Sequence, residues 1–342
     1  MGYLFIGLLV VFVMYDVIII GSGPAGLTAA IYTTRANLKT LIIAGSKWGG
    51  QLMLTSIVEN FPGFPEGIYG PDLMIAMRKQ AERHGAEVIE ENFTNGDFSK
   101  SGGTFKVTAG NNTYETKSVI IATGADTKWL GVPGEKEKIG RGVSSCAPCD
   151  AAFFRDKNVI VVGGGDSAME EAIFLARFAK SVTVIHRREE FRASKIMQEK
   201  AKQNPKISFM FNSEITEILG ENRVTGVKIK SPFSVIPNSF RDLASLEMLK
   251  QVQHDNKEVT WEMPIDGVFM AIGHTPNTGA FKGIDIDEQG YIVVHDHTKT
   301  NVEGVFVAGD VHDSHYQQAI TAAGYGCAAA LEVERWLTSR ES

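Results

Sequence analysis

Cysteine is scarce in this chain: only three occur in 342 residues, and two of them are Cys146 and Cys149. So few cysteines exclude a secreted scaffold held together by disulfides and favour a reducing compartment, which predicts a cytoplasmic protein. Excess positive charge is also missing, because the formal net charge is −6. The chain as a whole therefore offers no basic face to nucleic acid.

Stable insertion into a membrane is not expected either. Residues 4–13 form an apolar run, but a membrane-spanning helix needs about 20 residues. The run also lacks the basic leading segment and the small-residue cleavage site of a secretory signal. We expect Met14 to be the natural start and residues 1–13 to be an upstream extension; a membrane-associating tail is the alternative.

Glycine, by contrast, is abundant at 35 residues, and two glycine-rich segments follow the same local pattern. Each is preceded by a short β-rich run and followed by a helical pattern and a second β-rich run, as in a nucleotide-binding β–α–β unit. The expected elements are strand 15–20, helix 27–36 and strand 40–44 in the first unit, and strand 158–162, helix 168–179 and strand 181–185 in the second. We further expect a helix at 71–85, hairpin strands and a buried strand within 103–125, a buried strand at 303–310 and a helix at 317–337.

The two units lie about 140 residues apart, which indicates two domains rather than a short repeat. The predicted fold class is α/β, with two Rossmann-like nucleotide-binding domains. Each domain is expected to hold a parallel sheet with helices and an antiparallel β element.

The first glycine loop matches the GxGxxG pattern of a dinucleotide site through Gly21, Gly23 and Gly26. The first glycine permits the tight turn, the second lets the backbone approach a pyrophosphate, and the third lets helix and strand pack closely. No acidic residue ends the following strand, where NAD ribose would be bound; Gly45, Ser46 and Lys47 stand there instead. Ordinary NAD binding is therefore not expected at this first site.

The second loop reads GxGxxA, with Gly163, Gly165 and Ala168. The strand that follows ends in a basic cluster, His186–Arg188 with Arg192 just beyond. Guanidinium groups suit a 2′-phosphate, which arginine binds in a bidentate manner. The pattern predicts NADPH; the alternative is a solvated basic strand end.

The sequence Cys146-Ala-Pro-Cys149 is followed at once by Asp150. A zinc site needs about four ligands, and neither a second CxxC nor a nearby histidine pair is present, so a redox dithiol is favoured. The pair lies at a predicted helix start, which favours the reactive thiolate. Asp150 is placed to supply a proton to a leaving thiolate; the alternative is a carboxylate that stabilises the first turn. Cys327 is expected in the core.

Residues 231–257 interrupt the β pattern with a loop and a short amphipathic helix that carries Leu243, Leu246, Leu249 and Val252. We interpret this stretch as an insertion on a surface hairpin, since added loop length costs little closure entropy. It is either inert or a partner-binding helix.

Together these motifs resemble those of the bacterial-type, low-molecular-weight thioredoxin reductases, the class II pyridine nucleotide-disulfide oxidoreductases. The resemblance runs from about residue 15 to residue 337, apart from 231–257. It implies FAD in a discontinuous domain of residues 1–126 and 274–342, and NADPH in residues 127–273. The implied FAD-binding residues are Gly21, Gly23, Pro24, Ala25, Gly26, Gly45, Ser46, Lys47, Gly49, Gly50, Gln51, Leu52, Asn60, Ala122, Thr123, Gly124, Gly309, Asp310, Gln317, Gln318 and Ala319. The implied NADPH-binding residues are Gly163, Gly165, Asp166, Ser167, Ala168, Glu171, His186, Arg187, Arg188 and Arg192.

The same resemblance implies a role for each member of the dithiol site. Cys149 would face the flavin, Cys146 would attack the disulfide of thioredoxin, and Asp150 would be the acid. Phe153, Phe154 and Arg141 are the implied contacts with thioredoxin. A homodimer is expected, as is rotation of the two domains about hinges at 125–128 and 271–275.

The function predicted from the sequence is thus thioredoxin-disulfide reductase: NADPH reduces FAD, FAD reduces the Cys146–Cys149 disulfide, and the dithiol reduces thioredoxin. A related flavoprotein that acts on another small redoxin, or as a dithiol oxidase, is the enzymatic alternative. A redox-sensing binding protein is the alternative outside the enzymes.

Overall fold

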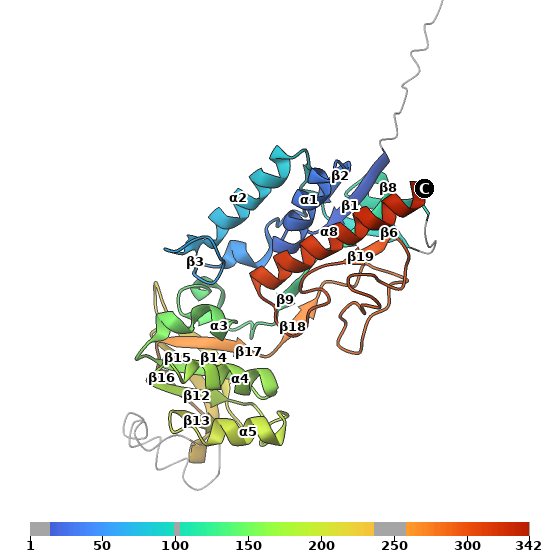
Figure 1. The fold of residues 1–342 in the computed structure, drawn as a ribbon. Helices are drawn as coiled ribbons and strands as arrows, with labels where there is room; N and C mark the ends of the chain where they lie inside the picture. Colours follow the sequence, from blue (N-terminus) through green and yellow to red (C-terminus); the bar gives the residue numbers. More distant parts are fainter. Residues whose placement is uncertain (1–13, 99–102, 236–257, 342) are drawn as a thin grey trace, which may run out of the picture. The chain divides into compact units, whose positions relative to one another are not determined.

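The computed structural model describes residues 14–98, 103–235 and 258–341. These residues form two compact units (Figure 1), and the chain passes between them after Asp126 and after His274. The first unit holds the residues up to Asp126 and those from Thr275 onward, and the second holds Thr127–His274. The expected extension at 1–13 and the expected amphipathic helix at 243–252 lie outside the described ranges.

The first unit is built on a mixed sheet with β1 (Met14–Ile20) near its centre. Parallel to β1 run β2 (Thr40–Ile43) and β5 (Glu87–Ile89) on one side, and β8 (Asn112–Ile121) followed by β19 (Val305–Val307) on the other. β7 (Phe105–Ala109) and β6 (Phe93–Asp97) continue the sheet from β8 in antiparallel fashion. The run Val17–Ile20 is buried along its whole length, as expected for a parallel strand covered on both faces.

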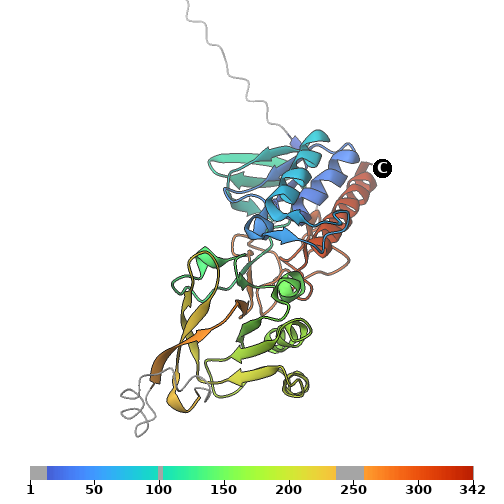
Figure 2. The same cartoon turned by 90° about the vertical axis from the view of Figure 1, so that its left-hand side faces the viewer.

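Three helices of the first unit lie side by side against its sheet (Figure 2): α1 (Pro24–Arg35), α2 (Gly70–Arg83) and α8 (Ala319–Glu341). Val17 and Ile19 of β1 pack with this helical layer, together with Leu27 of α1. Ile18 and Ile20 point to the opposite face and pack with a second apolar cluster. The period of two along β1 therefore divides the unit into two core layers.

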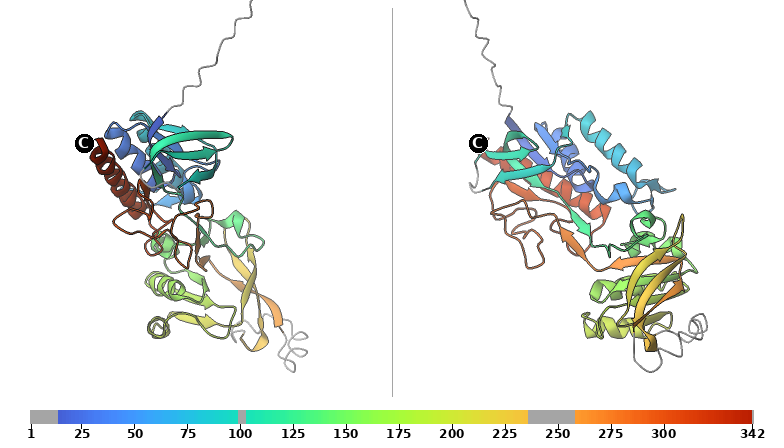
Figure 3. Two further views of the ribbon diagram at one scale, coloured as in Figure 1. Left: turned by 90° about the vertical axis from the view of Figure 1, so that its right-hand side faces the viewer. Right: turned by 180° about the vertical axis from the view of Figure 1, so that it is seen from behind.

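The second unit contains a five-stranded parallel sheet (Figure 3), ordered β10 (Val143–Ser144), β17 (Gly267–Ala271), β11 (Asn158–Gly163), β12 (Ser181–Ile185) and β13 (Ile207–Met210). One core cluster joins β11 to α4 (Asp166–Leu175) and the region of α5 (Lys195–Lys202). The other joins the sheet to an antiparallel element of β14 (Glu214–Leu219), β15 (Gly226–Pro232) and β16 (Glu258–Pro264). The predicted fold class is confirmed.

The remaining described elements are short. They are β3 (Ile57–Val58) with β4 (Ile68–Tyr69), β9 (Ala125–Thr127) with β18 (His274–Pro276), α3 (Ala147–Asp150), and the single 3₁₀ turns η1 (Gly50–Leu54), η2 (Lys136–Lys138), η3 (Ala151–Phe154) and η4 (Phe233–Val235). β9 and β18 contain the two places where the chain changes unit. No helix within the described ranges is both long enough and apolar enough to cross a membrane.

Several expected elements have different bounds in the structure, as α1 shows by beginning at Pro24 and α8 by ending at Glu341. For two others the physical reason is clear. The strand expected at 303–310 is β19, which covers only Val305–Val307, because Gly309 adopts a left-handed conformation with φ of 78° and turns the chain. The helix expected at 168–179 begins at Asp166, directly after the N-cap Gly165, and ends at Leu175. Phe178 then closes a tighter turn by donating to the carbonyl of Leu175.

The stretch expected to be an insertion joins two paired strands. β15 and β16 are antiparallel and remain in register as far as Pro232 and Glu258. The hairpin expected around the insertion is therefore present, while residues 236–257 lie outside the described part of the chain.

Two glycines of α8 give a matched test of helix packing in the first unit. A Cβ on Gly326 would lie 2.1 Å from the carbonyl oxygen of Ala25 in α1, whereas a Cβ on Gly324 would meet nothing within 4 Å. We expect Gly326→Ala to lower the free energy of unfolding by about 1–3 kcal/mol through overpacking. Gly324→Ala should instead raise it by up to about 1 kcal/mol, because alanine favours the helix. Urea unfolding followed by circular dichroism measures both, and equal effects would contradict this packing.

Candidate functional site

The first glycine loop connects β1 to α1, and steric contact explains two of its glycines. A Cβ on Gly21, whose φ is 116°, would lie 2.1 Å from the carbonyl oxygen of Ala122. A Cβ on Gly26 would lie 2.0 Å from the carbonyl oxygen of Gly21. Gly23, in contrast, faces open space and is the N-cap of α1, with Pro24 at the helix start. The loop thus leaves room for a phosphate at the N-terminus of α1.

The segment that follows β2 is tied to this loop by a serine. The hydroxyl of Ser22 donates to the carbonyl of Ala44 at 2.9 Å and accepts from the Gly49 N–H at 3.0 Å. Gly50 lies against Gly23, since a Cβ on Gly50 would be 3.4 Å from the Gly23 Cα. The structure therefore brings the predicted segments 21–26 and 45–52 together.

Other predicted residues of the first unit are held by hydrogen bonds to distant parts of the sequence. Thr123 donates to the carbonyl of Asn277 at 2.8 Å, and the Asn277 amide donates to the carbonyl of Thr123 at 3.1 Å. The Gln51 amide donates to the carboxylate of Asp126 at 3.1 Å. The Asn60 amide donates to Gln318 at 3.4 Å. These bonds position polar groups from four distant stretches of sequence within one unit.

Asp310, which follows β19 in the first unit, is half-buried and carries a carboxyl group with one buried oxygen. Its oxygen Oδ1 is buried and has no hydrogen-bond partner among the described residues. Burial, with a smaller effect from the charge of Asp313, raises the pKa of Asp310 to about 7. The preceding Gly309 packs its Cα region against the Ala25 side chain of α1. An unpaired buried carboxyl is costly unless a ligand hydroxyl completes it, so the residues present fit the sugar alcohol of a flavin dinucleotide.

The second glycine loop repeats the geometry of the first. A Cβ on Gly163 would lie 2.3 Å from the carbonyl oxygen of Ala271. Gly165 is the N-cap of α4 and faces open space. The middle glycine, Gly164, has a role that the sequence did not reveal: a Cβ there would lie 2.3 Å from the ring of His186.

Hydrogen bonds hold the arginine-bearing segment against this loop. The N–H groups of Arg192 and Ala193 donate to the carbonyl of Gly164 at 2.7 and 3.0 Å. The carboxylate of Asp166 accepts from the Ser194 N–H at 2.6 Å. His186 is buried, and its ring nitrogen Nε2 lies 3.0 Å from the carbonyl of Glu190. His186 and Asp166 therefore hold the arginine-bearing segment in place through hydrogen bonds to its backbone.

The basic side chains of that segment are open to solvent. Arg187, Arg188 and Arg192 are exposed, and within the described ranges no carboxylate forms a salt bridge with them. Burial and the neighbouring arginine charges lower the pKa of His186. A neutral imidazole and three free guanidinium groups fit a 2′-phosphate beside the second loop.

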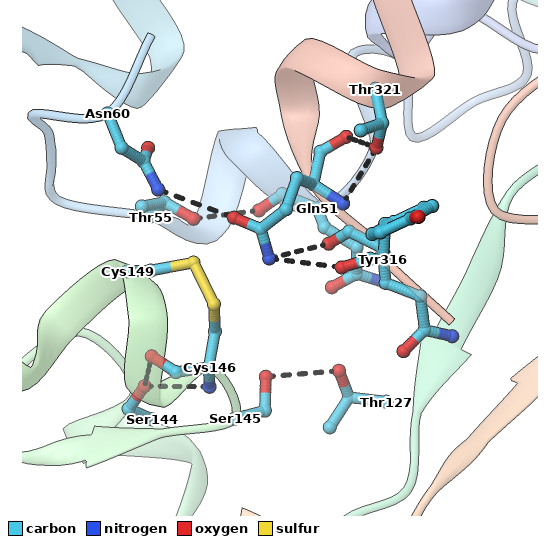
Figure 4. The surroundings of a disulfide bond; sticks show 12 residues. Gln51, Thr55, Asn60, Thr127, Ser144, Ser145, Cys146, Cys149, Tyr316 and Thr321 are labelled. Carbon is cyan, nitrogen blue, oxygen red and sulfur yellow. Dashed lines mark hydrogen bonds between the residues drawn. A yellow bond between two sulfur atoms is a disulfide. The ribbon is translucent and has the colours of Figure 1, made fainter. Parts of the chain in front are cut away.

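The cysteines of the CxxC sequence form a disulfide with a Cα–Cα distance of 5.3 Å. Both are half-buried and lie at the start of α3. The Ser144 hydroxyl accepts from the Cys146 N–H at 3.1 Å (Figure 4) and also hydrogen-bonds to Asp150. Sequence reasoning took Ser144 only as part of the predicted helix start before the cysteines, and did not predict its contacts with Cys146 and Asp150.

Two carboxyl groups lie around this disulfide within the second unit. Burial raises the pKa of Asp150, although the bond from Ser144 opposes the shift. Burial also raises the pKa of Glu171 to about 8, while a hydrogen bond from the Ala147 N–H opposes the shift and the charge of Asp150 adds to it. Glu171 was expected at the NADPH site, and the structure places its carboxyl against the start of α3.

The two phenylalanines that follow the dithiol differ in exposure. Phe153 is 46 % exposed, whereas Phe154 packs edge-to-face on Phe269 of β17 with ring centroids 5.0 Å apart. Arg141 is exposed. Of the residues predicted to contact a redoxin, Phe153 and Arg141 thus offer surface, and Phe154 is used mainly in the core.

Comparison with protein families and curated proteins gives consistent results. The family model described as pyridine nucleotide-disulphide oxidoreductase matches residues 15–326. A thioredoxin reductase of Mycolicibacterium smegmatis is 50% identical over 96% of this chain and 98% of its own length. A thioredoxin reductase of Streptomyces clavuligerus is 50% identical over 95% of this chain and 94% of its own length.

Comparison with solved structures agrees. The crystal structure of thioredoxin reductase from Streptococcus pyogenes has a TM-score of 0.84 and 41% identity, over 95% of this chain and 99% of that one. Thioredoxin reductase from Giardia duodenalis has a TM-score of 0.83 and 42% identity over the same shares.

The buried acid of the first unit predicts a pH-dependent stability. The pKa of Asp310 is about 7 in the folded protein and about 3.9 in an unfolded chain. The folded state therefore binds more protons between these values, and stability falls as the pH rises through this window. In flavin-free protein, Asp310→Asn should raise the melting temperature relative to wild type at pH 8 and change it little at pH 4.

Thermal unfolding at the two pH values measures this difference. Glu288→Gln, which changes an exposed carboxyl in the same unit, is the matched control and should show no such dependence. An Asp310→Asn effect of equal size at both pH values would contradict the assignment.

Proposed function

The chain belongs to the pyridine nucleotide-disulphide oxidoreductase family, and from this premise we propose that it is a thioredoxin reductase. The reaction converts NADPH, a proton and the disulfide of thioredoxin into NADP⁺ and the thioredoxin dithiol. The observation that carries the proposal is the Cys146–Cys149 disulfide, held in the same unit as the arginine-flanked dinucleotide loop. Relatives with 50% identity over nearly the whole chain support the choice of substrate.

The first unit is proposed to hold FAD, which when bound accepts an electron pair from NADPH and passes it to a disulfide. Gly23 and the N-terminus of α1 would receive the pyrophosphate, because the loop is open there. Asp310 would hydrogen-bond to a hydroxyl of the flavin side chain, which would complete its unpaired oxygen. The segment 45–52 would lie along the cofactor, since Ser22 ties it to the first loop.

The second unit is proposed to hold NADPH. The loop from Gly163 to Ala168 leaves Gly165 open for the pyrophosphate. Arg187, Arg188 and Arg192 would bind the 2′-phosphate, which distinguishes NADPH from NADH. His186 would keep the arginine-bearing segment in place through Glu190 rather than contact the phosphate.

The dithiol would reduce thioredoxin by thiol–disulfide exchange. Cys146 attacks one sulfur of the thioredoxin disulfide, which releases a thiolate and leaves a mixed disulfide. Cys149 then attacks Cys146 and releases the second thiolate, so that the Cys146–Cys149 disulfide forms again. Asp150 supplies a proton to a leaving thiolate, a role that its raised pKa supports.

The exposed ring of Phe153 is the proposed apolar contact with thioredoxin, since an exposed aromatic beside the reactive sulfur suits a partner surface. Arg141 is the proposed charged contact. A homodimer remains a prediction from the family resemblance, and sedimentation analysis of the purified protein tests it. A cytoplasmic location remains a prediction from the scarcity of cysteine.

The function is tested by anaerobic titration of the FAD-loaded protein with NADPH, followed by addition of oxidised thioredoxin. We expect the flavin absorbance to bleach and thioredoxin thiols to appear. Bleaching without transfer to any redoxin would favour a redox-sensing protein, and oxygen-driven oxidation of a dithiol would favour a dithiol oxidase.

Substitution of the cysteines should separate the two halves of the reaction. Cys146→Ser and Cys149→Ser should each abolish NADPH-dependent thioredoxin reduction while FAD stays bound. Cys327→Ser should retain turnover, because this cysteine forms no disulfide and lies on α8 of the first unit, whereas Cys146 and Cys149 belong to the second unit. Turnover that persists in either single variant of the pair would refute the mechanism.

Substitution of the arginines should alter cofactor choice. Arg187→Ala should raise the KM for NADPH on the order of ten- to a hundredfold, because a charge-assisted contact is lost, and should leave the KM for NADH unchanged. Lys180→Ala, at the other end of β12, is the control and should change neither constant. An equal rise in the KM for NADPH and in the KM for NADH would show that Arg187 does not bind the 2′-phosphate.

A further inference from the structure

Glu171 carries a buried carboxyl group that the mechanism above does not use. It lies on α4, which packs against α3, and it accepts a hydrogen bond from the N–H of Ala147, the residue after Cys146. Its other oxygen, Oε2, is buried and has no hydrogen-bond partner among the described residues. A carboxylate with an unsatisfied buried oxygen is costly, so the surroundings favour the protonated form.

The charge of Glu171 interacts with that of Asp150, at the end of α3. Asp150 in turn hydrogen-bonds to Ser144, whose hydroxyl accepts from the Cys146 N–H. Ser144, Asp150 and Glu171 therefore place hydroxyl and carboxyl groups around α3. Two interacting carboxyls titrate as a pair, and the pair keeps one proton to a higher pH than either group would alone.

Few other charges act on this pair. Asp166 and Glu170, the neighbouring acids of α4, are exposed, as are Lys195 on α5 and Arg155 after η3. Asp150 is the one charged group that shifts the pKa of Glu171 within the described part of the chain, and the resulting value is about 8. At neutral pH the proton of the pair therefore resides on Glu171.

We propose that Glu171 holds a proton for the dithiol site and transfers it to Asp150 during thiol–disulfide exchange. This role rests on the proposed function. It assigns Glu171 to the proton path, and the residue acts through Asp150 without touching the substrate.

The proposed step balances in protons and electrons. A dithiol with one thiolate and one thiol reduces one disulfide by two electrons, which yields the Cys146–Cys149 disulfide and two product thiols. One of the two protons needed comes from the second thiol of the enzyme. The other passes from Glu171 to Asp150 and from Asp150 to the leaving thiolate, and solvent then returns a proton to Glu171.

The test compares two disulfides that differ in their need for a proton. The enzyme dithiol is prepared with dithiothreitol and desalted, so that neither NADPH nor thioredoxin takes part. Its reaction is then followed in stopped flow with 5,5′-dithiobis(2-nitrobenzoate), whose acidic leaving thiol needs no proton, and with bis(2-hydroxyethyl) disulfide, whose alkyl thiol does. The ratio of the alkyl to the aryl rate cancels the pH dependence of the attacking thiolate.

In the wild-type protein we expect this ratio to be constant at neutral pH and to fall as the pH rises through about 8, where Glu171 loses its proton. Glu171→Gln preserves an acceptor for the Ala147 N–H but stores no proton. It should lower the ratio at pH 7 by about tenfold and abolish the fall near pH 8. Glu170→Gln, the exposed neighbour on the same helix, should behave as wild type.

A ratio in Glu171→Gln equal to that of wild type would overturn the proposal. If this variant does not fold, the wild-type profile decides, because a ratio that is constant between pH 7 and 9 also overturns it. Asp150→Asn provides a second variant and should abolish the fall near pH 8 as well. Since no step involves NADPH or thioredoxin, failure of this role and failure of the proposed function give separate results.

Discussion

In each unit of this protein the first glycine of the nucleotide loop is pressed against the carbonyl oxygen of a neighbouring strand. Any Cβ at Gly21 or Gly163 would come within 2.1 or 2.3 Å of Ala122 or Ala271 respectively. This contact lets the chain turn at once from the strand into the helix, so that the helix N-terminus opens beside the strand ends. Neighbouring segments are held to the loop that this turn creates, because Ser22 accepts from the Gly49 N–H in the first unit and the Gly164 carbonyl accepts from the N–H groups of Arg192 and Ala193 in the second.

Buried carboxyl groups mark the places where chemistry is proposed. Asp310 in the first unit and Glu171 in the second each have an oxygen that is buried without a partner, and burial raises the pKa of both. A folded protein bears such a cost only where something else uses the group. For Asp310 we propose that a ligand hydroxyl completes the group, and for Glu171 that a second carboxyl next to the disulfide takes its proton. The same physical feature is thus proposed to serve binding in one unit and proton supply in the other.

Much of the fold followed from local patterns. The apolar run Val17–Ile20 and the repeated strand–loop–helix pattern predicted two parallel sheets, because both signals depend only on nearby residues. The errors lay at element ends: β19 is shorter than expected since Gly309 turns the chain, and α4 begins earlier since Gly165 is its N-cap. Roles that depend on residues far apart in the sequence were missed, as with Gly164 beneath His186 and with Ser144 between Cys146 and Asp150.

The sequence by itself determined the two dinucleotide loops, the CxxC pair and the family, because each is encoded in a few residues at fixed spacing. Only the tertiary structure decided which side chains are buried, and therefore which acids hold protons and which aromatic ring is free. Phe153 and Phe154 are adjacent and chemically identical, yet one is exposed and the other packs on Phe269. Solvent exposure and electrostatic environment are set by contacts between distant segments, and no spacing along the chain records them.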